Sequence, residues 1–532
     1  MEKERSEEVV QRAFTPRAFI IGLILVAAWS FFGNYVGMRM TDFAALGRLT
    51  NATAASILTI FFLRWLFSAL KAKGFREGEL ILIYVMLMSS LFQMIGEASI
   101  DIDVPTWGIS TPLYGMLESP YKDFITSCTP SFWFPEPSIS EPMLLGGAPT
   151  PWGAWLIPLM FWLSYQLSFV VIFLCLALIL SNYIIETERL PFPFASVVHQ
   201  IIKEPEKKLS EAINTKLVGI AFIIGFLIQS TYGLLQTIIP AIPKWPEIGY
   251  GIYGVDLGPI VGPNYALNQC LVIPLGDIAL MVAILFLVPS KILLTALLTC
   301  PVAWNIIVAT ETQMGLYTDY PAKYGAYGLI PIWLPLFGDW DIGTGTQFYM
   351  LHIGVAFGIT LSLLALSYKA FANSLKAAIS GKRSGRFPDT LLWIGLIGSL
   401  LIHFALQSIS GMPISGIIVL FLMSFVTMYV MIRMRGEAIL THAAFDQWPR
   451  HGLIFEALGG DPSLGTKELY TSVMLTHAES VFLSTGAVSW MAREGFRLCE
   501  MTKPKTSWKG IAVSGLVSVT VALIISWLLY IW

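Results

Sequence analysis

Long apolar runs, separated by short polar stretches, recur along the chain from Ala18 to the last residue. A helix needs about 20 apolar residues to cross the hydrocarbon core, and its backbone must satisfy its own hydrogen bonds there. The pattern therefore predicts membrane-spanning helices. The candidate spans are Pro16–Gly37, Ala52–Leu70, Glu79–Gly96, Trp155–Ile185, Ile213–Ile239, Leu271–Val288, Ile292–Thr310, Phe348–Phe371, Thr390–Gln407, Ile414–Ile432 and Trp508–Trp532.

The composition supports this interpretation. Hydrophobic residues make up 55% of the 532 residues and charged residues 13%, whereas a soluble domain carries about 25% charged residues. The mean hydropathy is +0.68, and the net charge of −2 indicates no nucleic-acid partner. We expect an all-α polytopic membrane protein, a single transmembrane domain over residues 1–532 with about 11 to 14 transmembrane helices, some of them broken or re-entrant.

The basic residues predict the orientation, because cytoplasmic loops carry an excess of Lys and Arg. With the N-terminus placed inside, most of the 33 basic residues fall on the inner side. The exceptions are Arg39, Arg48, Lys122, Lys244 and Lys323 in outer loops and Arg64 within a span. We therefore expect a multi-pass protein of the plasma membrane with a cytoplasmic N-terminus.

Three of the predicted outer loops are long: residues 97–150, 240–269 and 311–347. Loops of this length are usually lids or folded caps, so a cap over an outward vestibule and ordinary extracellular packing both stay open. Cys128 and Cys270 lie in two of these loops, where a disulfide and two unrelated free thiols are the alternatives.

Residues 469–490 are long enough to cross the membrane, but a crossing would place five following basic residues outside. Ser472, Thr476, Ser480 and Ser484 recur every four residues and form a polar stripe on one helical face. His477 and Glu479 flank this stripe. A re-entrant or cavity-lining helix, a pair of short helices, and an amphipathic helix on the inner surface are the alternatives.

A weak internal similarity suggests two related halves. Phe14-Thr15-Pro16 and Phe387-Pro388-Asp389 each open a pair of spans that basic residues and a Glu follow. Repeated halves are common in secondary transporters. Halves of about residues 14–290 and 291–532 are one interpretation of the pattern.

Ionisable groups inside spans are candidates for substrate or ion binding, because a charge in the bilayer is costly. Asp277 follows Pro274 and Gly276, which can unwind a helix and free carbonyls for a cation, and an N-cap is the alternative. His352 and His403 titrate in a range suited to proton coupling, and packing is the alternative. Arg64 lies six residues from the inner end of its span, where it can snorkel or pair with an acid.

An acidic cluster follows the third span. Glu97 is a further candidate for ion binding on the outer side, and Asp101 and Asp103 form an Asp-x-Asp pair that could ligate a divalent metal. Such a pair would suit a membrane glycosyltransferase, although two Asp residues around one Ile often occur by chance.

The stretch Asn182–Ile202 closes the longest apolar run. It places Glu186 and Glu188 at the helix end and then breaks the helix at Pro191 and Pro193. The orientation puts this break at the cytoplasmic face, so we expect an inner gate whose short apolar continuation returns toward the bundle. An amphipathic surface helix is the alternative.

Three short motifs resemble one family. FREGEL at Phe75–Leu80, continued by ILIYVMLMSS, is similar to the opening of a helix in the oligopeptide transporter (OPT) family and its uncharacterised prokaryotic relatives. ERLPFP at Glu188–Pro193 and IRMRGE at Ile432–Glu437 resemble two further motifs of these proteins, in the same order. The resemblance implies a secondary transporter, typically proton-coupled, that moves small peptides or metal–chelator complexes inward. The chain is shorter than typical peptide-moving members and lacks their NPFNIKEH-type and KIPPR-type sequences.

We therefore expect a secondary active transporter, coupled to a proton or another cation, for small peptides or metal-chelate-like solutes. It would have no enzymatic activity and no cofactor, and the sequence leaves a homo-oligomer open. The alternatives are a metal-dependent membrane glycosyltransferase and a non-transporting subunit of a membrane complex. GxxxxGK[ST], HExxH and GxSxG motifs are absent from the sequence, which disfavours an ATP-driven pump and common hydrolases.

Overall fold

The structure is a computed structural model of the whole chain. It describes residues 15–39, 49–70, 74–91, 111–118, 120–144, 148–203, 254–256, 272–274, 345–437, 467–479, 487–502 and 508–532, with residues 216, 217, 219, 220, 223, 290 and 294. The chain forms two compact units, Met1–Glu206 with Ala356–Trp532 and Lys207–Val355. The first unit holds all the sites described below.

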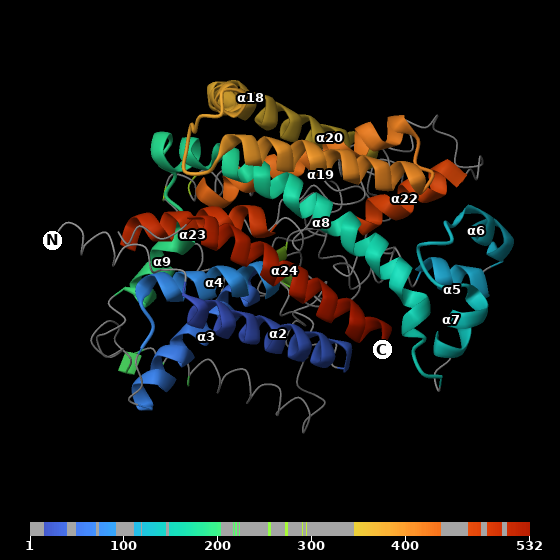
Figure 1. Cartoon of the computed structure of the whole chain (residues 1–532), viewed down its shortest axis with the longest axis horizontal. Coiled ribbons are helices and arrows are strands. Elements are labelled where there is room, and N and C mark those ends of the chain that lie inside the picture. Colours follow the sequence, from blue (N-terminus) through green and yellow to red (C-terminus); the bar gives the residue numbers. More distant parts are fainter. Residues whose placement is uncertain are drawn as a thin grey trace. The chain divides into compact units, whose positions relative to one another are not determined.

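Helices dominate the described residues (Figure 1). The longer helices are α2 (Pro16–Arg39), α3 (Leu49–Ala69), α4 (Glu77–Leu91), α8 (Trp152–Asn182), α18 (Gly345–Ile379), α19 (Asp389–Ile409), α20 (Ile414–Glu437), α23 (Ala487–Thr502) and α24 (Trp508–Ile531). The shorter ones are α5 (Thr111–Glu118), α6 (Lys122–Cys128), α7 (Pro137–Leu144), the π-helix η3 (Tyr183–Thr187), α9 (Pro193–Ile202) and α22 (Lys467–Ala478).

Four segments of the described chain are long and apolar enough to cross a membrane: Pro16–Tyr35, Trp152–Thr187, Asp389–Ile409 and Trp508–Ile531. They coincide with four of the predicted spans, and α3, α4, α18 and α20 coincide with four more. The prediction of an all-α membrane protein is therefore confirmed.

The second unit contains a two-stranded antiparallel sheet. Strand β1 (Gly254–Asp256) pairs with strand β2 (Val272–Pro274). The predicted span Leu271–Val288 thus opens on a strand rather than on a helical turn. Pro274 lies at the end of this strand, where its missing N–H leaves the ladder intact.

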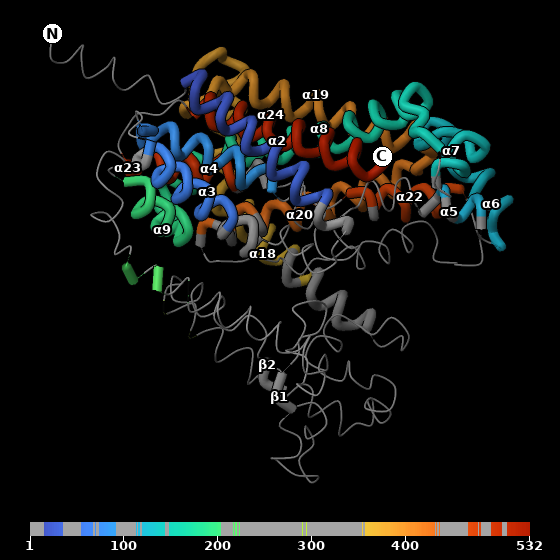
Figure 2. The backbone as a smooth tube through the Cα atoms, turned by 90° about the horizontal axis from the view of Figure 1, so that it is seen from below, coloured from blue at the N-terminus to red at the C-terminus, as the bar shows by residue number. Residues whose placement is uncertain are grey.

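The first unit is built around α8 and α4 (Figures 1 and 2). Helix α19 packs along α8, while α2 and α24 pack on α4 and on each other. Helix α23 contacts α4, α8, α9 and α24, so it joins the two groups. Gly495 permits the close approach of α23 to α4, because a Cβ there would lie 2.6 Å from Cγ2 of Val85.

The first long outer loop is folded in its described part. Helices α5, α6 and α7 occupy it, and α5 contacts both α6 and α7. Trp133 anchors the loop to the bundle: its ring lies against Trp162 of α8, its indole N–H donates to Ser410, and its carbonyl accepts from Trp162. Cys128 is a free, buried thiol, and Cys270 lies outside the described residues.

The segment 469–490 forms parts of two helices, α22 and α23. Thr471, Ser472, Leu475 and Thr476 are all fully buried, so α22 does not lie on the surface of the unit. The alternative of an amphipathic surface helix is wrong for this half of the segment. Ser480 and Ser484 lie outside the described residues.

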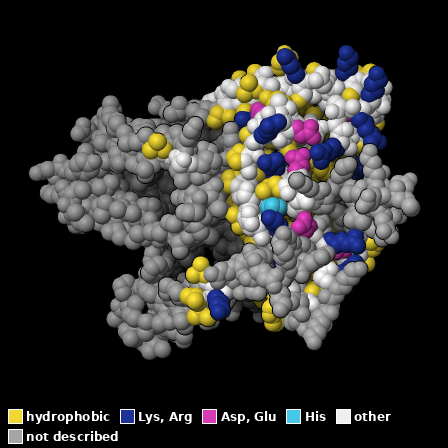
Figure 3. All heavy atoms as spheres, turned by 90° about the vertical axis from the view of Figure 1, so that its left-hand side faces the viewer, with side chains coloured by type: hydrophobic (Ala, Val, Ile, Leu, Met, Phe, Trp, Pro, Cys, Tyr) yellow, Lys and Arg dark blue, Asp and Glu magenta, His cyan; other side chains and the backbone are white. Residues whose placement is uncertain are grey.

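Basic side chains gather at one end of the first unit, where α8 ends and α19 begins (Figure 3). Exposed basic residues in the helix ends and turns there include Arg76, Arg189, Lys203, Lys376, Lys382, Arg383, Arg386 and Lys509. All of them come from segments that the sequence places inside. The fold therefore brings these predicted cytoplasmic charges together. Lys467, which the sequence also places inside, instead begins α22 beside α6 of the first predicted outer loop, and the orientation itself stays a prediction.

Candidate functional site

A buried carboxylate lies where α22 ends. Glu479 follows the last residue of α22 and is only 2% exposed. Its Oε1 accepts hydrogen bonds from the Tyr165 hydroxyl at 3.0 Å and from Gln407 Nε2 at 2.7 Å, and lies 2.9 Å from Nε2 of His403. Its Oε2 accepts from the Ser424 hydroxyl at 2.7 Å. Helices α8, α19 and α20 thus all contribute to the site around this carboxylate, which we call the Glu479 site.

Further contacts hold the partners of Glu479 and the end of α22 in place. The rings of Tyr165 and His403 stack with their centroids 4.7 Å apart. Nδ1 of His403 lies 2.9 Å from the Ser168 hydroxyl. Gln166 donates to the carbonyl of Ala478 at 2.7 Å and so binds the end of α22 directly to α8.

One acceptor of the Glu479 site is open. Oε1 of Gln407 is buried and has no hydrogen-bond donor among the described residues. Leaving a buried amide oxygen without a donor costs about 1–3 kcal/mol of folding free energy. The site therefore offers an N–H or O–H group of a ligand both a carboxylate and a free carbonyl.

The local sequence explains how the site forms. Tyr165 and Ser168 share one face of α8, and His403 and Gln407 lie one turn apart on α19. His403 lies six residues before the end of α19, roughly 9 Å along the helix axis. The polar groups are thus inside two of the segments long enough to span, where each needs a partner from another helix.

A second cluster lies at the C-terminal end of α8. The helix widens into the π-helix η3, and two non-glycine residues after it, Arg189 and Phe192, adopt positive φ angles of 53° and 45°. Such conformations cost about 1–3 kcal/mol each. The N–H of Phe192 donates to the carbonyl of Gly436 on α20 at 2.9 Å, which secures the break. A Cβ on Gly436 would lie 2.9 Å from Cδ1 of Leu190.

The chain that follows the break is buried. Phe192 is 2% and Phe194 6% exposed, Val197 is half-buried, and α9 contacts α23 and α4. Pro193 occupies the first position of α9, where its missing N–H is harmless, and Pro191 is exposed in the turn before it. This burial favours a segment that returns into the bundle over a helix on the surface.

Ion pairs close the break. Glu188 binds Arg433 of α20, and both side chains are half-buried. Arg386 pairs with Glu186 at 3.3 Å and with Glu500 at 2.9 Å, and its guanidinium lies 3.8 Å from the centroid of the Trp508 ring.

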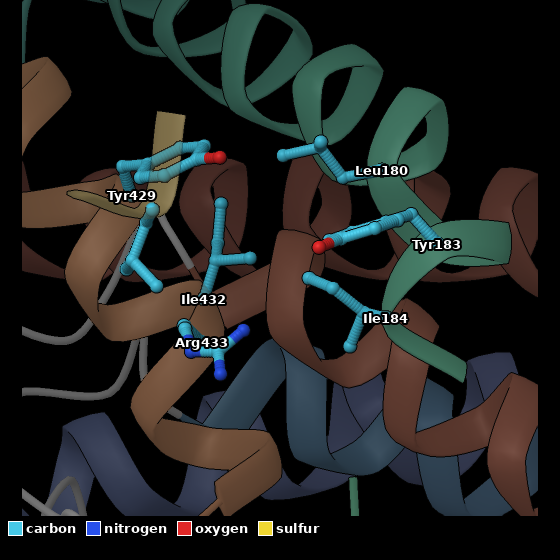
Figure 4. A pocket seen from close by; sticks show the side chains of 7 residues that line it. Leu180, Tyr183, Ile184, Tyr429, Ile432 and Arg433 are labelled. Carbon is cyan, nitrogen blue, oxygen red and sulfur yellow. The ribbon is translucent and has the colours of Figure 1, made fainter. Parts of the chain in front are cut away.

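A small pocket opens beside the Glu188–Arg433 pair (Figure 4). It is lined by Leu180, Tyr183, Ile184, Leu363, Tyr429, Ile432 and Arg433. Two tyrosines and one arginine supply its polar groups, and the remaining lining side chains are aliphatic.

Arg493 connects the two clusters. It lies on α23, is fully buried, and donates from Nε and Nη2 to the carbonyl of Ala177 on α8 at 3.0 and 2.9 Å. Its Nη1 donates to the carbonyl of Ile432 on α20 at 3.4 Å. Burial lowers the pKa of the Arg493 guanidinium to about 9, so this group stays charged at neutral pH.

Several predicted site residues lie outside the described residues: Asp277, Glu97, Asp101 and Asp103. The backbone of His352 belongs to α18, and its side chain is not described. Their roles as ion, substrate or metal ligands stay predictions. No group of three or more metal-ligating side chains occurs among the residues that the structure describes.

Arg64 and His403 have different surroundings. The guanidinium of Arg64 is buried and donates to the carbonyl of Ile201, near the end of α9. A cation at a helix C-terminus is favourable, so this contact gives Arg64 a structural role in holding α9. His403, in contrast, is at the centre of the Glu479 site. The structure therefore does not bring these two residues to one site.

Glu479 was not among the predicted site residues. The sequence shows it beside the polar stripe of residues 472–484, in a segment whose crossing of the membrane is undecided. Its partners are separated from it by 55 to 314 positions along the chain. The available signal was the polar stripe itself, because polar residues at helical spacing in an apolar protein need partners.

These features define a polytopic α-helical membrane protein with a buried carboxylate–imidazole site and a helix break after α8. Residues 8–532 match the model of a family described as "Family of unknown function (DUF6785)", and the chain belongs to this family. No curated protein and no solved structure matches the chain.

Proposed function

We propose that the protein is a secondary active transporter, coupled to protons, for small peptides or metal-chelate-like solutes. The observation that carries the proposal is the Glu479 site. A buried carboxylate at the end of a short helix, with polar partners from three other helices, is costly unless it binds something. Helices that end inside the bundle are the usual location of substrate and ion sites in such transporters.

The open acceptor supports a solute with N–H or O–H donors. The ammonium group of a peptide would bind the carboxylate of Glu479, and one of its protons would satisfy Oε1 of Gln407. The same groups would accept donors of a metal-chelating solute. This chemistry leaves the two solute classes open and disfavours solutes without a hydrogen-bond donor.

The inner break supplies a gate in this proposal. Glu188 and Glu186, with their arginine partners, hold α8 to α20 and to the start of α19. Breaking these pairs would release the inner end of α8, where the strained residues Arg189 and Phe192 provide a hinge. The gate would face the cytoplasm, with the N-terminus inside and the protein in the plasma membrane.

Access to the Glu479 site tests the proposal without a known solute. Ser424→Cys is introduced into a variant whose five native cysteines are replaced by alanine. A charged, membrane-impermeant thiol reagent is then added to right-side-out and to inside-out vesicles. A transporter alternates access, so we expect modification of this cysteine in both kinds of vesicle.

Ser518→Cys is the matched control. Ser518 is also fully buried, on α24, and its hydroxyl bonds only the Ser514 carbonyl of its own helix among the described contacts. We expect no modification there. If the cysteine at position 424 resists the reagent from both sides, the protein is not a transporter with this site. That result would support the alternative of a structural subunit.

A further inference from the structure

The geometry around His403 couples the orientation of the Ser168 hydroxyl to the protonation of the imidazole ring. Oγ of Ser168 lies 2.7 Å from the carbonyl of Tyr165 and 2.9 Å from Nδ1 of His403. A hydroxyl has one hydrogen, so Ser168 can donate to only one of these two atoms. The direction of this single bond therefore depends on whether Nδ1 of His403 carries a proton.

We propose that His403 and Glu479 form a binding site for one exchangeable proton and that the Ser168 hydroxyl is its rotary switch. In the loaded state, Nδ1–H of His403 donates to Ser168, and Ser168 donates to the carbonyl of Tyr165. Nε2–H of His403 donates to the Glu479 carboxylate at 2.9 Å. The pair is then an imidazolium and a carboxylate with no net charge.

Release of the proton from Nδ1 requires only a rotation of the Ser168 hydroxyl. Ser168 then donates to the bare Nδ1, while Nε2–H still donates to Glu479. The Tyr165 carbonyl loses this donor but is already an acceptor in the helical ladder of α8. Both states thus keep every nitrogen of the imidazole bonded, and they differ by one proton that leaves for water or for a solute.

The surroundings decide which groups share this titration. From α8, Tyr165 faces the pair, and α19 and α20 contribute the uncharged Gln407 and Ser424. On α22, Tyr470 instead bonds Thr129 at 2.9 Å, away from the pair. Among the described side chains that contact Glu479, His403 is thus the one cationic group.

The two protonation states of the pair differ in charge. The consequence of this difference rests on the proposed function, because a transporter must couple the proton to movement. The loaded pair is neutral, whereas the unloaded pair leaves one negative charge in an apolar bundle, which is costly. The unloaded site therefore requires a cationic group or water before the helices around it move.

The experiment is a proton titration of the full-length protein in lipid nanodiscs without any solute. Infrared difference spectra between acidic and alkaline pH report imidazole and carboxylate groups together. We expect one group of bands in which both change. His403→Gln should abolish this group, whereas Glu479→Gln should abolish the carboxylate bands and shift the midpoint of the imidazole bands. Glu500→Gln, which alters an ion pair at the unit's basic end, is the control that keeps them.

Ser168→Ala tests the switch with little change in volume. It removes the acceptor of a charged N–H in the loaded state but only the donor to a neutral nitrogen in the unloaded state. The charged bond is the stronger one, so we expect the proton affinity to fall about tenfold, equivalent to 1.36 kcal/mol. Ser168→Thr retains the hydroxyl and should restore the affinity.

Bands that persist unchanged in His403→Gln would overturn the proton site. An unchanged midpoint in Ser168→Ala would overturn the switch. Since no solute is added, either failure leaves the thiol-access test of transport intact. Conversely, the pair could titrate while the site stays closed to thiol reagents. That combination would refute the transport function but not the proton site.

Discussion

The hydrogen bond from Ser424 to Glu479 gives the sharpest single measurement. Ser424→Ala removes a buried hydroxyl, 1% exposed, that donates to Oε2 of Glu479 at 2.7 Å. A hydrogen bond to a charged group stabilises a protein by about 1.5–3 kcal/mol, and a neutral one by about 0.5–1.5 kcal/mol. Interhelical bonds in membranes average about 0.6 and reach about 1.7 kcal/mol. The range for bonds to charged groups and the range for interhelical bonds overlap near about 1.5 kcal/mol, which is therefore the expected contribution of this bond when Glu479 is ionised.

The assay is a double-mutant cycle on the free energy of unfolding in mixed micelles. We expect Ser424→Ala to cost about 1.5 kcal/mol in the native background and about 0.6 kcal/mol in the Glu479→Gln background, where the bond is neutral. The coupling energy is then about 1 kcal/mol. Ser518→Ala removes a hydroxyl that bonds its own helix and should show no coupling to Glu479→Gln.

Equal costs of Ser424→Ala in the two backgrounds would refute the reasoning. Such a result would mean that Glu479 is neutral at the pH of the measurement or that the Ser424 bond does not form. Repeating the cycle at higher pH separates these cases, because a neutral Glu479 would ionise and the coupling would appear, whereas an unformed bond would show no coupling at any pH.

Three further predictions concern the end of the bundle around the break after α8. Gly436→Ala should destabilise the protein by about 1–3 kcal/mol in thermal unfolding, because the added Cβ overpacks the break, whereas Gly398→Ala, with open space around it, should gain up to about 1 kcal/mol; equal effects would contradict this packing. Arg433→Gln should cost roughly 1–3 kcal/mol, between an exposed and a buried ion pair, and the exchange Glu188→Arg with Arg433→Glu should recover part of it, which a purely steric role of Arg433 would not allow. Burial lowers the pKa of His199 on α9 below its ordinary 6.5, so the unfolded chain binds more protons and stability should fall as the pH drops below 6.5, an effect that His199→Gln should remove from the pH dependence of unfolding.

The sequence predicted the helices well because their signal is local. Apolar runs of spanning length set the bounds of α2, α8, α19 and α24 to within a few residues, since only the run itself has to avoid water. Pro191 and Pro193 likewise located the break after α8, because each removes a backbone donor. The π-helix before the break had no such signal, because it continues the apolar run without a proline or glycine.

The Glu479 site was only partly predictable. His403 was a candidate because a histidine inside a span is rare, whereas its partner came from a segment of undecided topology. Which polar side chains meet depends on how α8, α19, α20 and α22 pack, and their spacing along the chain carries no information on that packing. Arg64 lies within a predicted span and donates to the carbonyl of Ile201 near the end of α9, a contact that the sequence did not predict, and its role as a ligand stays a prediction.

Buried charges explain why the two clusters belong together. Replacing a buried ionic group by apolar side chains of equal volume is often neutral or stabilising, so packing alone does not require Arg493. Its guanidinium nevertheless binds both α8 and α20. These helices carry Tyr165 and Ser424 at the Glu479 site. At the break, Glu188 directly follows the π-helical end of α8 and pairs with Arg433 of α20. Ala177 lies between Tyr165 and Glu188 along α8 and its π-helical end, and Ile432 directly precedes Arg433 on α20. A movement of α8 against α20 at either cluster must therefore strain the bonds of Arg493, which makes this residue the physical connection between proton binding and the gate in the proposed transporter.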